Sequence, residues 1–177
     1  MIAWMLPWGL MGRMLFLCCA LAIAGCAETQ GRFTIEVRSP DVGNASTRLV
    51  TYGTALRGTD RYAIALTVRE PLYLYVEQRS GEGIAPLLPS AGTTLDLVHP
   101  GVALQIPHDG FLKLGAQHGD VFVYVVASNQ PLSVDLARLE VDKAASGGDS
   151  ASGRDVSVSG ELDSRGIGII RFKLVRR

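Results

Sequence analysis

Cysteine is scarce in this chain, and its few copies are confined to one end. Of 177 residues, only Cys18, Cys19 and Cys26 are cysteines, so the long remainder has no thiol pair for a disulfide or a zinc site. An excess of one charge is also missing, because 17 acidic residues balance 17 basic ones. This balance excludes the basic footprint of a nucleic-acid-binding protein.

The sequence motifs of common active sites are missing as well. There is no G-x-S-x-G turn of a hydrolase and no G-x-x-x-x-G-K phosphate loop, and serines gather in residues 146–159. Four aspartates lie near predicted turns, where carboxylates commonly accept hydrogen bonds from local backbone: Asp60, Asp96, Asp109 and Asp120. The sequence therefore predicts no catalytic residues and no enzyme, with a hydrolase built from Ser, His and Asp gathered by folding as the alternative.

The three histidines, His99, His108 and His118, do not form a metal-binding pattern. No His-x-x-His pair is present, and each histidine adjoins Gly, Pro or Asp in a predicted turn. His99 and His108 flank a predicted strand over residues 102–106, which places them about 25 Å apart. We therefore expect no metal site and no cofactor.

The first 25 residues have the pattern of a signal peptide. A run of about a dozen apolar residues starts at Met14, too short to span a bilayer comfortably, and Arg13 is the only charge before it ends. The run closes with Ile23, Ala24, Gly25 and Cys26. This order of aliphatic, small, small and Cys resembles the lipobox of bacterial lipoproteins.

The lipobox resemblance implies a processed and acylated chain. Cleavage would precede Cys26, whose sulfur would carry diacylglycerol, leaving residues 1–25 as signal peptide and 26–32 as a short tether. Ala27 in place of aspartate implies the periplasmic face of the outer membrane, in the cell envelope. Two or more acyl chains would anchor the protein stably. A plain secretory signal with an incidental cysteine is the alternative, and translation could begin at Met1 or at Met11.

Residues 33–177 are long enough for one domain, and their pattern is mainly of strands. Residues 33–38 alternate apolar and polar side chains, and residues 62–68 and 72–77 read as a hairpin joined across residues 69–71. Further short strands end with one over the last dozen residues. Ser133 is placed to cap a short helix over residues 134–141, followed by a flexible Gly/Ser loop over residues 144–155. The predicted fold class is all-β, a mainly antiparallel β-sandwich or barrel with one helix near the C-terminal third.

The central residues 56–132 resemble the bacterial domain-of-unknown-function family 4384. A Gly-x-Asp turn at Gly58 precedes one strand, and an aromatic strand, a glycine turn and a Leu-x-Pro follow. The residues that carry this second likeness are Tyr73, Tyr75, Gly81, Gly83, Leu87 and Pro89. The resemblance implies a non-catalytic β-domain found on envelope lipoproteins.

The sequence thus predicts a membrane-anchored envelope lipoprotein with a non-enzymatic interaction or accessory domain. The candidate interaction surface comprises Tyr73, Tyr75, Leu87 and Pro89, at a strand edge or in the proline-containing residues 84–90. Tyr73 and Tyr75 would share one strand face, as a half-buried layer or as a ligand platform. The partners are the bilayer and an envelope protein or glycan. The alternatives are an envelope hydrolase or a structural subunit of a secretion or envelope complex.

Overall fold

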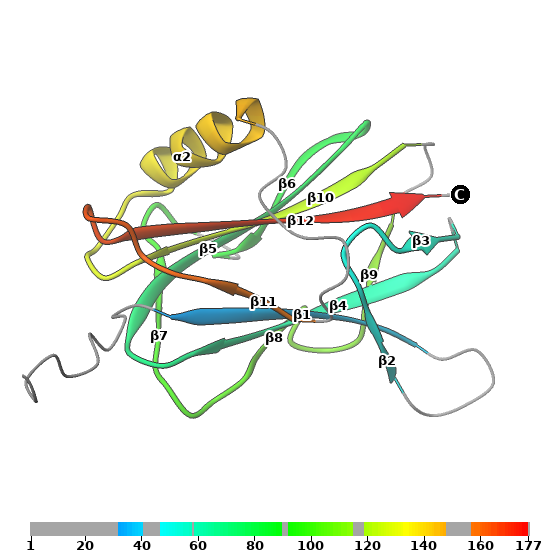
Figure 1. The fold of residues 1–177 in the computed structure, drawn as a ribbon, viewed down its shortest axis with the longest axis horizontal. Coiled ribbons are helices and arrows are strands. Elements are labelled where there is room, and N and C mark those ends of the chain that lie inside the picture. The colour runs from blue at the N-terminus through cyan, green and yellow to red at the C-terminus, as the bar shows by residue number, and fades with distance from the viewer. Residues whose placement is uncertain are drawn as a thin grey trace, which may run out of the picture.

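The computed structural model describes residues 32–40, 47–57, 59–89, 92–114, 119–147 and 157–176. Two mainly antiparallel sheets stack face to face, and one helix lies on the outside of the second sheet (Figure 1). The elements are β1 (Phe33–Pro40), β2 (Thr47–Val50), β3 (Ala55–Leu56), β4 (Arg61–Val68), β5 (Leu72–Ser80), β6 (Gly83–Leu88), β7 (Asp96–Val98), β8 (Leu104–Ile106), β9 (Leu112–Lys113), β10 (Val121–Ser128), α2 (Val134–Ser146), β11 (Ser157–Gly160) and β12 (Ile167–Arg176).

The first sheet has the order β11-β1-β4-β8, with β2 also paired to β1 and β9 to β4. The second sheet has the order β3-β12-β10-β5-β6, with β7 also paired to β5. Every pairing is antiparallel except that of β3 with β12. The all-β fold class predicted from the sequence, with one helix near the C-terminal third, is therefore confirmed.

Alternation of apolar and polar residues sets which strand faces line the core. In β1, Phe33, Ile35 and Val37 are buried between the sheets, and Ile170, Phe172 and Leu174 play the same role in β12. Side chains two positions apart share one face of a strand, so each strand contributes one apolar row to the interior. The predicted final strand is confirmed as β12.

The predicted hairpin between residues 62–68 and 72–77 is wrong. β4 pairs with β1 and β8 in the first sheet, whereas β5 pairs with β10, β6 and β7 in the second. The three-residue connection turns from one sheet to the other, and the Arg69 N–H donates to the Arg32 carbonyl at 3.1 Å as it leaves β4. A connection of three residues is short enough for a hairpin and also for a turn from one sheet to the other. Only the pairing partners of the two strands distinguish these alternatives.

The helix begins where its cap was predicted. The Ser133 hydroxyl accepts a hydrogen bond from the Leu136 N–H at 3.3 Å, as an N-cap does. The helix continues to Ser146, so the first residues assigned to the flexible loop are helical, while residues 148–156 lie outside the described residues. The signal peptide and Cys26 lie outside them too. Within the described ranges, no helix is long and apolar enough to cross a membrane.

Candidate functional site

The outer face of the second sheet carries an apolar cluster of its own, which α2 covers. Tyr75 of β5 and Tyr124 and Val126 of β10 are buried there against Ala137 and Val141 of the helix. This cluster is separate from the core between the sheets. The sandwich therefore has a third layer over one sheet (Figure 1).

A network of polar side chains, which we call the tyrosine cluster, fixes one side of α2. The Tyr75 hydroxyl donates to Glu77 at 2.6 Å and accepts from Arg138 of the helix at 3.1 Å. Glu77 is fully buried and also accepts a hydrogen bond from Arg79, whose guanidinium lies 2.7 Å from Asp142. Burial, followed by the hydrogen bond to Glu77, raises the pKa of Tyr75 to about 12. The buried Glu77 carboxylate therefore has two hydrogen-bond donors, the Tyr75 hydroxyl and the Arg79 guanidinium, and is not left unpaired.

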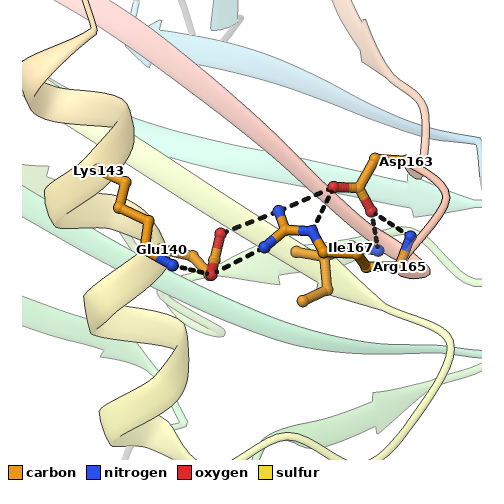
Figure 2. Close-up of polar contacts among 5 residues, drawn as sticks. All are labelled: Glu140, Lys143, Asp163, Arg165 and Ile167. Atoms are coloured by element: carbon orange, nitrogen blue, oxygen red, sulfur yellow. Dashed lines mark hydrogen bonds and ion pairs between the residues drawn. The ribbon is translucent and has the colours of Figure 1, made fainter.

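A second network, which we call the turn cluster, fixes the other side of α2 (Figure 2). Arg165, in the β11–β12 turn, donates two hydrogen bonds of 3.1 Å to Glu140, and Lys143 donates a third at 2.7 Å. Asp163 orders the same turn by accepting from the Arg165 and Ile167 backbone N–H groups at 2.9 and 3.1 Å. The hydrogen bonds from Lys143 and then Arg165 lower the pKa of Glu140.

The structure does not present the four predicted interaction residues as one surface. Tyr73 and Tyr75 do share the outer face of β5, but Tyr75 is buried and its hydroxyl is bonded within the tyrosine cluster. Pro89 is buried as well, and Leu87 is half-buried against the core between the sheets. The predicted surface therefore needs correction at Tyr75, which α2 covers, and at Pro89, which is buried.

The edge strand β6 is accessible. It pairs with β5 on one side, and no pairing on its other side occurs among the described residues. Its first four residues, Gly83 to Pro86, are exposed, and Ile84 is 56% exposed although it is apolar. Five of its six residues, Ile84 to Leu88, belong to the proline-containing residues 84–90 that the sequence singled out. The strand leaves the β5–β6 turn at one end of the sandwich (Figure 1).

The other predicted polar residues lie apart from one another, and Asp96 begins the strand β7. The His108 side chain is 93% exposed and lies 3.3 Å from Asp109. Asp60 accepts from the Arg57 N–H at 2.8 Å, the local role predicted for it. Within the described ranges, no three His, Cys, Asp or Glu side chains are grouped as metal ligands would be. His118 lies outside the described residues.

The two polar clusters around α2 are what the sequence interpretation missed. A usable signal was present, since Arg138 and Asp142 are four positions apart on the helix and Glu77 and Arg79 continue the tyrosine face of β5. A search against protein-family models, curated proteins and solved structures found no match for the chain. The likeness to the domain-of-unknown-function family stays a prediction from the sequence.

Proposed function

We propose that the protein is a membrane-tethered interaction module of the bacterial cell envelope whose partner adds a strand to β6. The observation that carries this proposal is the accessible edge of β6. An unpaired strand edge offers a row of backbone N–H and C=O groups to another chain. A β-sandwich with such an edge can bind a partner without catalytic residues.

The composition of β6 favours binding over protection. Proteins commonly blunt an edge with charged side chains, proline or short strand length. β6 contains Pro86 and has a register shift against Val76 and Glu77, but it has no charged residue. Its six residues exceed the two to four of β2, β3, β8 and β11, which also lie at sheet edges. Its exposed Ile84 gives a partner an apolar side chain to cover.

The edge is tested by photo-crosslinking in native cells. Ile84 and Ala85 point to opposite faces of the sheet, and a strand added beside β6 lies close to both side chains. Photoreactive labels at the two positions should therefore give adducts with the same partner. Leu49 of the edge strand β2 is the matched control, because it is 49% exposed and apolar. Adducts from only one of the two β6 positions, or equal adducts from Leu49, would contradict strand addition.

The tether rests on the order Ile23, Ala24, Gly25 and Cys26, and is tested separately by mass spectrometry of the membrane fraction. We expect a mature chain that begins at acylated Cys26, and a Cys26→Ser strain in which neither acylation nor cleavage occurs. An unmodified chain in the soluble fraction would refute the tether and leave the edge-binding proposal to be judged on the crosslinks alone.

A further inference from the structure

The tether predicted from the sequence is short, which limits how far the domain can stand from the membrane. This inference rests on the proposed acylation of Cys26. Six residues separate Cys26 from Phe33, the first residue of β1. Since an extended chain spans at most about 3.6 Å per residue, the start of β1 lies within about 20–25 Å of the lipid headgroups.

Several connections lie at the same end of the sandwich as the start of β1, and two of them contain the exposed residues Arg69 and Val102. Phe33 pairs with Val68 at the end of β4, so residues 69–71 are adjacent to the tether. Val98, at the end of β7, pairs with Leu72 at the start of β5, so residues 99–103 leave the sheet at this end too. We call residues 69–71 and 99–103 the proximal loops.

The β6 edge extends to the opposite end. Ile84 pairs with Arg79, seven positions along β5 from Leu72, which corresponds to about 23 Å along the strand. The β5–β6 turn lies beyond it, and Figure 1 shows this turn on the side away from the start of β1.

The proximal loops have the side chains that suit a headgroup layer. Val102 is 69% exposed, more than any other large apolar side chain of the described residues. Arg69 and Glu70 balance each other in residues 69–71, so this loop brings no net negative charge to the lipid surface. An exposed apolar side chain gains burial by entering the interface between headgroups and acyl chains.

We propose that the proximal loops rest on the lipid surface, with Val102 in the headgroup layer, and that the β5–β6 end points away from the membrane. The orientation leaves the β6 edge open to a partner in the aqueous compartment. It also gives Val102 a partner of defined chemistry, a phospholipid surface.

The orientation is tested with acylated protein in vesicles of phosphatidylethanolamine and phosphatidylglycerol that contain a headgroup-spin-labelled lipid. Single cysteines at Val102, Ile84 and Leu136 receive a fluorophore; Leu136 lies on the exposed face of α2, and all three native side chains are exposed and apolar. The sequence leaves no other free thiol once the signal peptide is removed and Cys26 is acylated. Compared with vesicles without the spin label, we expect fluorescence from the Val102→Cys site to fall at least about twofold and fluorescence from the other two sites to change little.

Stronger or equal quenching at Ile84→Cys or Leu136→Cys would overturn the orientation, as would an unquenched Val102→Cys site. Vesicle flotation and the mass of the chain separate this failure from failure of the tether. A chain that floats and is acylated but has the wrong quenching pattern refutes the orientation alone. An unacylated chain that does not float refutes both proposals.

Discussion

Arg165 and Glu140 meet across the gap between the β11–β12 turn and α2, and two parallel hydrogen bonds of 3.1 Å join the guanidinium to the carboxylate (Figure 2). Glu140 is only 8% exposed, so its charge depends on these donors and on Lys143. Paired bonds of this kind fix direction as well as position. The contact therefore joins the helix to the end of the sheet on which it packs.

Removal of this contact should loosen the helix. We expect Arg165→Ala to lower the free energy of unfolding by more than the loss of an exposed ion pair does, because the buried Glu140 keeps Lys143 but loses two donors. Urea unfolding of the mature chain measures this change. Arg32→Ala is the matched control, since it breaks the exposed pair with Glu161 and should cost less than about 0.5 kcal/mol. Equal losses in the two variants would mean that the Arg165 contact adds nothing beyond a surface ion pair.

At acidic pH, protonation of Glu140 should lower the free energy of unfolding. Its pKa in the folded chain is lowered from the ordinary value of 4.5 by the hydrogen bonds from Lys143 and Arg165. The unfolded chain therefore binds the proton first, and this stabilisation is present above pH 4.5 and is lost as the pH falls through the folded value. We expect the unfolding free energy of Glu140→Gln to fall less steeply below pH 4.5 than that of the native chain. Parallel curves from urea titrations across this range would contradict the assignment.

At alkaline pH, ionisation of Tyr75 should lower the free energy of unfolding. Burial and the bond to Glu77 raise its pKa from 10.0 to about 12, so the unfolded chain loses the phenolic proton first. Stability is then complete below pH 10 and falls as the pH rises toward 12. We expect Tyr75→Phe to lessen this decline, and urea unfolding at a series of alkaline pH values measures it. An unchanged slope would show that Tyr75 ionises alike in the two states.

At neutral pH the same substitution removes one donor from the buried Glu77 carboxylate. We expect Tyr75→Phe to cost about 1–2 kcal/mol of unfolding free energy. Tyr73→Phe is the control, because it removes a hydroxyl from the same face of β5 outside the tyrosine cluster, and it should cost less than about 0.5 kcal/mol. A larger loss of unfolding free energy in the Tyr73 variant would contradict the role given to the Tyr75 hydroxyl.

Gly168 of β12 should not tolerate a side chain. A Cβ there would lie 2.6 Å from the Glu161 carbonyl oxygen and 2.9 Å from the Phe33 ring. Because one of these obstacles is backbone, Gly168→Ala should cost about 1–3 kcal/mol through overpacking. Thermal unfolding compared with Gly147→Ala provides the control, since a Cβ at Gly147 would have its nearest neighbours at 3.6 Å. Similar melting temperatures for the two variants would contradict this reading of the packing.

Part of the candidate site could be predicted from local sequence. The prolines of residues 84–90 indicated a strand edge or an extended loop, and the edge strand β6 covers most of these residues with Ile84 exposed. The burial of Tyr75 and Pro89 could not be predicted, because it depends on which distant segments pack over them. The α2 helix is far from Tyr75 in the sequence, and Arg138 meets its hydroxyl across 63 positions.

The sequence by itself determined the local features of this protein. Alternating apolar residues specified the strands β1 and β12, because side chains two positions apart share a face, and Ser133 specified the start of α2 through its hydroxyl. Only the tertiary structure decided that residues 69–71 cross between sheets and that α2 packs on β10 and β12 and reaches Tyr75 of β5. Both depend on contacts between segments distant in the chain, where many pairings satisfy the same local pattern and the best total burial selects one.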